Sequence, residues 1–517
     1  MMKKNIWIGC MLAWIIIAGC IDDRGNYDYR STDEIWPVKI SGLEAMDCQV
    51  GDQLNLTPTI TGTENMENLK YSWFLYTSGV AMSKEDTLSH EKELNWQISR
   101  EAGSYNLMFE VRDTVRDLFT KKSVSLKVRT FLSTGWFVLE TDGTGTDMDM
   151  ITPEGTTTEN LLTTYNSSGR MEGAPRKILY KMDHRHEVEN FDGTVEVVKK
   201  DAFILTSEKD IRVYDAQNMA LLKKREDCFY EMPTPVNPLN RFVNSTTDDH
   251  LNNDGQYYIL PAGNVGKFGY PLVGPDGTNN YNVHADGVSA SQRAFLWDKT
   301  SCSFLYASTG SQMVFLSEAS GNETNFGPVS KTDKELIHLM YRASEMINYV
   351  SKYKAYALWK DGNGKYTIVD LYFDKATYPI VGEYSLPQGN LLSTADIMVT
   401  HQNAPKLFFV ANGNELWEHN ISSNTDLSIR ERKVYTFPGG ERIACIRHLY
   451  ITNKYVDEQM DRLVVLTNSA DGWKLYGFEF IGGGSEFDMT VTPEEAMIGK
   501  GIGEAGYVMR MDNDRAF

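Results

Sequence analysis

The chain has 517 residues, of which 41% are hydrophobic and 11% aromatic, and a formal net charge of −19 at pH 7. So acidic a chain repels phosphate backbones, which argues against a nucleic acid as its partner. The aromatic content and the 41 glycines, without a low-complexity tract, indicate folded β-rich domains and argue against disorder.

The first 20 residues have the features of a lipoprotein signal peptide. Lys3 and Lys4 precede a mostly apolar run over residues 5–19, as in a secretory signal. The run is shorter than the roughly 20 apolar residues that a transmembrane helix needs. Its end, Ile17-Ala18-Gly19-Cys20, resembles the bacterial lipobox. We therefore predict a signal peptide over residues 1–19 and a lipidated Cys20, with an uncleaved anchor and a chance cysteine as the alternative.

Residues 20–35 are predicted to form a flexible acidic tether. Acyl chains on Cys20 would anchor the protein to a bilayer, since each buried methylene contributes about 0.8 kcal/mol. The acidic pair Asp22-Asp23 resembles the surface-export signal of Bacteroidota lipoproteins. That resemblance implies a lipid-anchored protein exposed at the cell surface of the outer membrane. A solvated linker facing the periplasm is the alternative.

Residues 36–130 are predicted to form a small β-sandwich. Residues 52–61 alternate apolar and polar side chains, as a half-buried strand does. The segment YSWFLY (71–76) places a Trp on a predicted central strand, and GSYNLMFEVRD (103–113) predicts a long strand. Several short strands with a central Trp are typical of an Ig-like sandwich. The pairing of these two segments resembles a PKD-type domain, in which the Trp packs in the core.

Residues 131–517 are predicted to form a β-propeller. Seven apolar strand segments begin at residues 136, 203, 257, 304, 356, 408 and 464, so they recur about every 50 residues, a period typical of propeller blades. Seven segments indicate seven blades, with six and eight as alternatives and a string of β-sandwiches as the rival fold. Residues 506–511 are predicted to close the ring with the first blade. The blade tryptophans are predicted to pack between blades: Trp136, Trp297, Trp359, Trp417 and Trp473.

Four cysteines remain after the signal peptide and Cys20 are set aside. Cys48, Cys228, Cys302 and Cys445 are far apart in the sequence, and this spacing excludes a zinc ribbon. Isolated buried thiols are the preferred interpretation, although the sequence leaves their disulfide state open. No cofactor is predicted.

The sequence contains none of the common catalytic motifs for metalloproteases, nucleotide hydrolases or serine hydrolases, so we predict a protein that is not an enzyme. His184 and His186 are two apart, which would place both rings on one side of a strand. The charges around them, from Asp183 to Glu189, favour a solvated loop, and no metal site is predicted there.

The most distinctive loop runs from residue 261 to residue 284 and is rich in Gly, Asn and aromatic residues. Amide groups and flat rings suit sugars or peptides, which need hydrogen bonds and an apolar platform. A loop that packs on itself is the alternative. The candidate ligand-binding residues are Phe268, Tyr270, Asn280, Tyr281 and His284.

The whole arrangement resembles the PKD-like family lipoproteins of Bacteroidota. The resemblance rests on Cys20 followed by DDRGNYDY, on YSWFLY (71–76) and on the repeats that follow. It implies a SusC/SusD-type outer-membrane importer as partner. The first hypothesis is a non-catalytic surface lipoprotein that captures or presents an oligomeric nutrient, glycan or peptide, for this TonB-dependent importer. A surface hydrolase or lyase on the propeller and a structural envelope scaffold are the alternatives.

Overall fold

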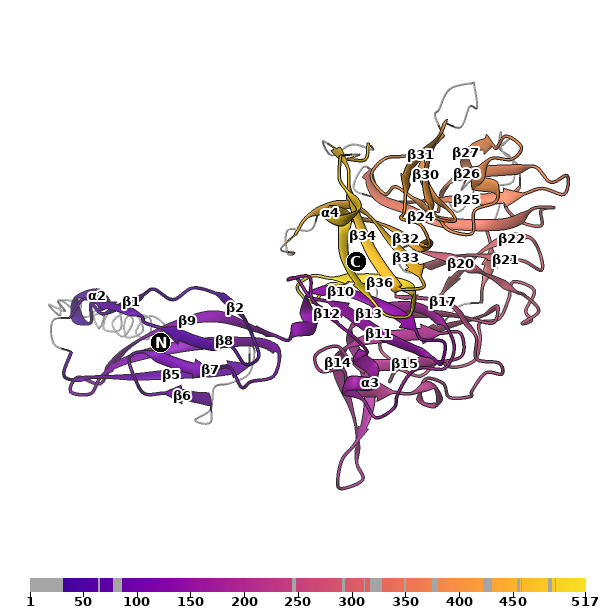
Figure 1. The fold of residues 1–517 in the computed structure, drawn as a ribbon. Coiled ribbons are helices and arrows are strands. Elements are labelled where there is room, and N and C mark those ends of the chain that lie inside the picture. The colour runs from indigo at the N-terminus through magenta and orange to yellow at the C-terminus, as the bar shows by residue number, and fades with distance from the viewer. Residues whose placement is uncertain are drawn as a thin grey trace, which may run out of the picture. The chain divides into compact units, whose positions relative to one another are not determined.

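The computed structural model forms two compact units, residues 1–129 and 130–517 (Figure 1). It describes residues 31–517 except for 64–65, 78–85, 244–247, 291–292, 311, 317–327, 348–349, 374–379, 422–429, 453–455, 457, 482–485 and 489. The predicted signal peptide, Cys20 and most of the predicted tether lie outside the described residues. In the described part of the chain, no helix is long and apolar enough to cross a bilayer.

The first unit is a β-sandwich of one five-stranded sheet and two strand pairs. Trp73 lies on a central strand, is fully buried, and packs against Phe109 with ring centroids 4.5 Å apart. The short helix α2 (Thr32–Ile35) precedes the sandwich. The five-stranded sheet has the order β2 (Met46–Gln49), β9 (Leu118–Arg129), β8 (Gly103–Asp113), β5 (Leu69–Thr77) and β6 (Thr87–Ser89). The pairs are β1 (Lys39–Ser41) with β4 (Thr59–Thr61) and β3 (Gln53–Leu56) with β7 (Leu94–Gln97).

The second unit is a β-propeller, and its described residues form seven antiparallel sheets, here called blades 1–7. Blade 1 contains β36 (Glu504–Met511), β10 (Gly135–Thr141), β11 (Thr146–Ile151) and β12 (Thr157–Thr158). Blade 2 contains β13 (Pro175–Glu189), β14 (Val195–Ser207), β15 (Ile211–Asp215) and β16 (Leu221–Lys223). Blade 3 contains β17 (Pro238–Val243), β18 (Asp249–Asn253) and β19 (Gln256–Leu260).

The remaining four blades follow in chain order. Blade 4 contains β20 (Val283–Ala290), β21 (Arg293–Asp298), β22 (Ser303–Ser308) and β23 (Val314–Phe315). Blade 5 contains β24 (Glu335–Ile347), β25 (Val350–Lys360), β26 (Tyr366–Tyr372) and β27 (Ile380–Ser385). Blade 6 contains β28 (Met398–Thr400), β29 (Leu407–Asn412), β30 (Glu415–Asn420) and β31 (Arg430–Thr436). Blade 7 contains β32 (Arg442–Ile451), β33 (Met460–Ser469), β34 (Gly472–Glu479) and β35 (Met497–Gly501).

Five short helical segments connect the strands of the described propeller. Their bounds are η2 (Phe131–Ser133), α3 (Leu161–Tyr165), η3 (Arg225–Asp227), η4 (Leu391–Ser393) and α4 (Pro493–Ala496).

The ring closes through the last strand of the sequence. β36 pairs antiparallel with β10, as predicted, and takes the inner position in blade 1. The inner strands then contact one another in cyclic order, namely β36, β13, β17, β20, β24, β28, β32 and again β36. Because every blade has a neighbour on both sides, no blade leaves an apolar face uncovered.

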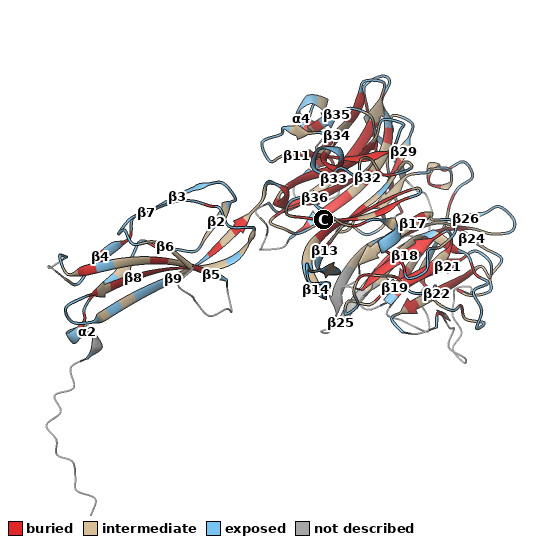
Figure 2. Cartoon of the chain, turned by 90° about the horizontal axis from the view of Figure 1, so that it is seen from below, coloured by how far each residue is buried: buried red, intermediate tan, exposed pale blue. Residues whose placement is uncertain are grey.

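The propeller core lies between neighbouring blades, where buried strand residues form successive layers (Figure 2). Trp297 of blade 4 and Trp359 of blade 5 belong to one buried cluster, and Trp136 of blade 1 and Trp473 of blade 7 belong to another. The predicted packing role of these four side chains is therefore confirmed. Trp417 is half-buried against the cluster between blades 5 and 6.

Blade 3 has three strands in the described residues, and a loop covers the place of a fourth. The loop runs from the end of β19 to the start of β20. The backbone N–H of Leu272 in this loop donates a hydrogen bond to the carbonyl oxygen of Tyr257 in β19. This loop is the one that the sequence singled out as a candidate binding loop.

Candidate functional site

Three polar hollows lie at one end of the propeller, the end at which the inner strands begin. The Arg442 hollow, about 520 Å³, lies over blades 6 and 7, where Ile397, Arg442 and Asn468 line it. The closure hollow, about 350 Å³, lies between blades 7 and 1. The arginine hollow, about 450 Å³, lies between blades 1 and 2. The first two share Ser469, Ala470 and Glu504, so they are continuous.

Turns of the first and last blades build the closure hollow. Its walls are residues 141–143 after β10, residues 469, 470 and 472 between β33 and β34, and residues 503–504 at the start of β36. Gly472 and Gly503 have φ values of 109° and 79°, which favour glycine because a Cβ atom strains such a backbone. A Cβ atom at Gly503 would collide with the Oε2 atom of Glu140. The backbone at Gly503, here called the floor, therefore lies between the hollow and Glu140.

A buried carboxylate lies directly beneath that floor. The side chain of Glu140 is at the end of β10, and its Oε1 atom accepts a hydrogen bond from Nη1 of Arg170 at 2.7 Å. Its Oε2 atom is buried and has no hydrogen-bond partner. Burial raises the pKa of Glu140 to about 7. The hydrogen bond from Arg170 lowers this pKa, and the negative charge of Asp149 raises it.

Two further buried carboxylates lie on the adjacent strand β11. Asp147 accepts hydrogen bonds from the backbone N–H of Leu162 and from the hydroxyl of Thr163, both at 2.8 Å. Asp149 accepts a hydrogen bond from Nε1 of Trp473 in blade 7 at 3.0 Å. Burial raises the pKa of Asp149 to about 6. These bonds hold negative charge below the closure hollow and link its two blades.

The arginine hollow differs, because its guanidinium groups are already paired. Nε of Arg212 donates to Asp210 at 2.9 Å, and its Nη1 and Nη2 atoms donate to backbone carbonyls. Arg225 forms an ion pair with Glu172 at 3.3 Å. These contacts fix the wall between blades 1 and 2 and leave the guanidinium groups largely occupied.

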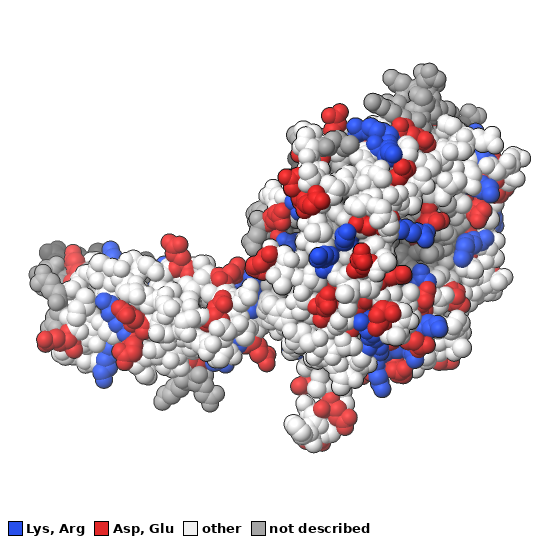
Figure 3. Space-filling model, viewed as in Figure 1, with Lys and Arg blue, Asp and Glu red and all other residues white. Residues whose placement is uncertain are grey.

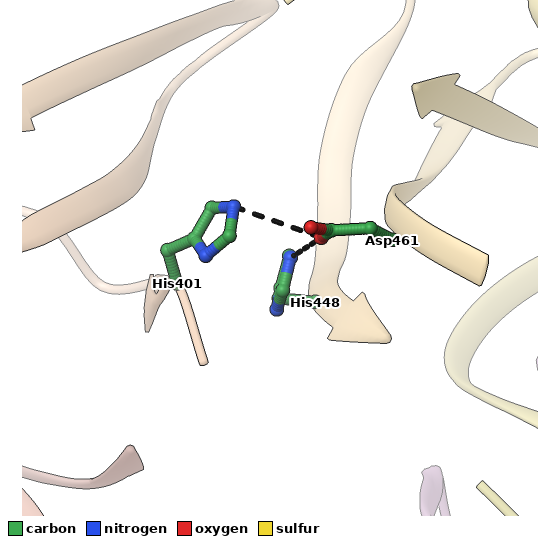
Figure 4. A group of neighbouring side chains, drawn as sticks. All are labelled: His401, His448 and Asp461. Carbon is green, nitrogen blue, oxygen red and sulfur yellow. Dashed lines mark hydrogen bonds and ion pairs between the residues drawn. The ribbon is translucent and has the colours of Figure 1, made fainter. Parts of the chain in front are cut away.

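A histidine–carboxylate cluster joins blades 6 and 7 (Figure 4), and we call His401, His448 and Asp461 the 401 cluster. Nε2 of His448 donates to Oδ1 of Asp461 at 2.8 Å, and Nε2 of His401 is 3.7 Å from the same oxygen. The two rings lie 3.9 Å apart between centroids. Burial and the charge of His448 lower the pKa of His401 to about 3, against the opposing charge of Asp461.

The 401 cluster has the spacing of a metal site but not its hydrogen bonding. The three ligand atoms lie within 4.8 Å of one another. However, Nδ1 of His401 accepts backbone N–H groups at 2.9 and 3.1 Å, and Nδ1 of His448 accepts one at 3.1 Å. A metal on Nε2 would require the proton on Nδ1, and metal-binding histidines ordinarily donate that proton to an acceptor. The pattern fits Nε2–H groups directed at Asp461 and does not fit a bound metal.

A second histidine–carboxylate group, the 338 cluster, joins the inner strands of blades 4 and 5 and consists of Asp286 and His338. Nδ1 of His338 lies 3.4 Å from Oδ2 of Asp286, and its Nε2 atom is 3.0 Å from the carbonyl oxygen of Ala395. Burial lowers the pKa of His338, but the hydrogen bond and charge of Asp286 outweigh burial, so the net pKa is raised. Both ring nitrogens thus face acceptors.

The structure does not bring the five candidate loop residues together into one site. Phe268 and Tyr281 are buried and belong to different interblade clusters. Tyr270 and Asn280 are exposed. His284 is half-buried, and its Nδ1 atom accepts the backbone N–H of Asp286 at 3.0 Å. The rings of Phe268 and Tyr281 therefore pack in the core and offer no platform to a ligand.

The prediction of a solvated loop around His184 and His186 is wrong, because both residues lie on strand β13. Both side chains are buried, and their rings are 6.4 Å apart. Burial, together with the nearby charges of Lys181 and Lys223, lowers the pKa of His184 to about 3. β13 and β14 continue through this segment as a long hairpin. Its many charged residues are typical of a turn, which is why the sequence indicated a loop.

The four cysteines Cys48, Cys228, Cys302 and Cys445 are free, so the prediction of isolated thiols is confirmed, whereas the prediction that they are buried is correct only for Cys228. Cys228 is buried and the other three are half-buried.

The buried carboxylates Glu140, Asp147 and Asp149 were missed by the sequence analysis. A signal was present, since Asp147 and Asp149 alternate with methionines in the segment TDMDMI (146–151). Alternation places both acids on one face of a strand, but it cannot show that a neighbouring blade covers that face.

Comparison with known proteins supports the N-terminal part of the assignment. Residues 20–175 match the model of the PKD-like family. No curated protein matches the chain.

Similar solved structures include a quinoprotein alcohol dehydrogenase-like protein of Bacteroides thetaiotaomicron, at 13% identity over 91% of this chain and 96% of that chain, with a TM-score of 0.38. The extracellular domain of a hybrid two-component system of B. thetaiotaomicron has 8% identity over 72% of this chain and 51% of that chain, with a TM-score of 0.31. PorZ, a surface component of the type-IX secretion system of Porphyromonas gingivalis, has 13% identity over 73% and 57% of the two chains, with a TM-score of 0.15. Likenesses of this strength say nothing about function.

Proposed function

We propose that this protein is a non-catalytic, lipid-anchored lipoprotein at the cell surface of the outer membrane. It assists a SusC/SusD-type TonB-dependent importer by capturing or presenting an oligomeric nutrient, glycan or peptide. The PKD-like sandwich acts as a spacer and docking piece, and the propeller presents its end face to the ligand.

The observation that carries this proposal is the order of the parts. A lipobox-like cysteine, Cys20, begins the segment 20–175 that matches the PKD-like family, and a propeller with polar hollows follows. An anchor, a spacer and a ligand-presenting face in this order suit a surface capture protein. The sequence contains none of the common hydrolase motifs, which supports binding over catalysis.

The anchor is tested by labelling cells with radioactive palmitate. The proposal expects label in the wild-type protein and none in a Cys20→Ala variant, which leaves the membrane fraction. Protease added to intact cells should degrade the wild-type protein. Equal membrane retention of both proteins would contradict the anchor, and protection from protease would contradict the surface location.

The capture role is tested with the protein lacking residues 1–20. Calorimetry with glycan and peptide oligomers measures ligand binding, and co-purification from outer membranes measures association with the importer. The proposal expects binding to at least one oligomer class and recovery of the importer at constant stoichiometry. Failure of both measurements would refute it.

A surface hydrolase is the second candidate, and Glu140 is the observation that favours it. Carboxyl groups with a raised pKa next to a hollow are common at catalytic sites, and burial raises the pKa of Glu140 to about 7. Its carboxylate is, however, closed off from solvent, which is unfavourable for contact with a substrate. Turnover of oligomers that a Glu140→Gln variant abolishes would establish the hydrolase instead.

A further inference from the structure

We propose that the closure hollow binds a positively charged group, the ammonium or guanidinium of a basic side chain in a peptide. The inference rests on the proposed function, because it names the class of oligomer that the propeller captures. It concerns the hollow between the first and last blades and is independent of the importer.

The lining of the closure hollow carries two carboxylates, of which Asp142 forms an ion pair with Arg170 at 3.3 Å. None of its described lining residues is a lysine or an arginine, whereas Asp142 and Glu504 both line it. The neighbouring hollows each include at least one guanidinium group among their lining residues. Of the three hollows, this one is therefore the most suitable for a cation.

A second and independent observation is the unpaired carboxylate oxygen below the floor. Glu140 is fully buried, and its Oε2 atom faces Gly503, which lines the hollow. Burial of an acceptor without a partner is costly. A cation in the hollow would offset part of this cost through space, because the thin glycine floor separates the charges by little protein.

The charge below the hollow is only partly neutralised. Arg170 forms ion pairs with Glu140 at 2.7 Å and with Asp142 at 3.3 Å. Asp147 and Asp149 are also buried beside it and bond to neutral N–H and hydroxyl groups. Charges in a poorly solvated region interact more strongly than charges in water. One arginine among these carboxylates leaves an excess of negative potential at the hollow.

The lining also distinguishes a peptide from a glycan. Sugars commonly stack on aromatic rings, which give an apolar platform, and none of the described lining residues of the closure hollow is aromatic. Its surface consists of backbone, small side chains and two carboxylates. Such a surface favours a charged, donor-rich group over a flat pyranose ring.

The experiment measures binding of trilysine to the protein lacking residues 1–20, by calorimetry at pH 7.5 and low salt. Nε-acetylated trilysine, triglutamate and maltotriose are the comparison ligands. We expect trilysine alone to bind, with an affinity that falls as salt is raised, because salt screens the attraction. Absence of trilysine binding would overturn the inference.

Variants then separate the hollow from the general acidity of the chain. Asp142→Asn combined with Glu504→Gln should weaken trilysine binding at least about tenfold, because both carboxylates line the hollow. Glu154→Gln combined with Glu189→Gln removes the same two charges from exposed positions outside the hollow and should leave the affinity unchanged. Equal weakening by both double variants would mean nonspecific attraction and would overturn the inference.

Glu140→Gln tests the buried carboxylate and should weaken binding by a smaller factor, about threefold to fivefold. The glutamine retains an acceptor for Arg170, and circular dichroism confirms folding. Unchanged affinity would remove Glu140 from the site.

Binding of maltotriose or triglutamate instead of trilysine would refute this inference and leave the capture function intact, whereas the absence of any oligomer or importer binding would refute the function itself.

Discussion

The 401 cluster and the 338 cluster contain the same residue types in the same propeller, yet the pKa values of His401 and His338 shift in opposite directions. In the 401 cluster, the Nδ1 atoms face backbone N–H donors, and the pKa of His401 falls to about 3. In the 338 cluster, both nitrogens of His338 face acceptors, and its pKa is raised. Both rings are in poorly solvated sites. Burial lowers the pKa of both rings; at His338 the hydrogen bond and charge of Asp286 outweigh burial, whereas at His401 the charge of Asp461 does not.

The two clusters consequently respond to pH with opposite sign. A depressed folded-state pKa, as for His401, gives stability that is complete above the unfolded value near 6.5 and is lost as the pH falls below it. A raised folded-state pKa, as for His338, gives stability that is complete below about 6.5 and is lost as the pH rises through the folded value. Four experiments test this contrast.

The largest expected effect is acid destabilisation through His401. Between pH 6.5 and pH 4.5, protonation of the unfolded state should cost about 2–3 kcal/mol, since one pKa unit corresponds to about 1.4 kcal/mol. His401→Asn removes the titration but keeps an acceptor for the N–H groups of Asn403 and Ala404. The variant should lose less stability than wild type over this range in urea unfolding. Parallel curves for the two proteins would contradict the low pKa of His401.

The next effect comes from removing the shared acceptor of the 401 cluster. Asp461→Ala leaves the buried Nε2–H of His448 without its partner at 2.8 Å and should destabilise the protein by about 1–3 kcal/mol. Asp461→Asn keeps an oxygen at this position and should recover part of the loss. Thermal unfolding of both variants decides the outcome, and equal melting temperatures for alanine and wild type would show that Asp461 does not hold the cluster.

A smaller effect is expected in the 338 cluster. Asp286→Asn removes the charge that raises the pKa of His338, so the pKa should fall below its value in the wild type. The titration of the ring, followed by NMR at pH 5–8, measures this directly. His90→Gln, an exposed change in the sandwich, is the control and should not shift the His338 curve. A constant His338 pKa in the Asp286 variant would mean that the carbonyl of Ala395 dominates.

The smallest effect is expected from metal ions. Because both Nδ1 atoms of the 401 cluster accept N–H groups, Zn²⁺ at stoichiometric concentration and EDTA should each leave the melting temperature within about 1 °C of its starting value. His448→Gln provides the matched protein for comparison. A zinc-dependent rise of several degrees in wild type that this variant lacks would establish a metal site and overturn our assignment of the protons.

Hydrophobic periodicity sufficed to predict the class of fold. The strand starts at Trp136, Phe203 and Tyr257 and their later repeats mark blades because blades pack face to face, so that one buried apolar strand recurs in each blade. The ring closure was also predictable, since residues 506–511 had no other partner strand. The β13–β14 hairpin was not, because between Asp183 and Glu189 two histidines take the buried positions at which a half-buried strand ordinarily has apolar side chains. Acidic side chains gather on this hairpin (Figure 3), at Glu187, Glu189, Asp192 and Glu196.

The candidate site was beyond reach of the sequence for a different reason. Glu140 and Gly503 are distant along the chain and meet only because β36 pairs with β10 within blade 1. Periodicity describes one strand at a time and carries no information about which turn of another blade lies above it. The aromatic loop around Phe268 was misleading for the converse reason, since rings that suit a ligand also suit a core.

The pairing of β36 with β10 sets an order of events during biosynthesis. β10 emerges early and remains without its inner neighbour until β36 has been made, so the first blade is completed last. During that interval the first blade's inner side is open to wrong pairing with strands of other molecules. A peptide bound in the closure hollow would bind only the finished ring. Its binding would therefore stabilise the closed ring relative to the open chain by mass action. If the protein captures a peptide nutrient, as proposed, that nutrient would extend the lifetime of the protein that binds it.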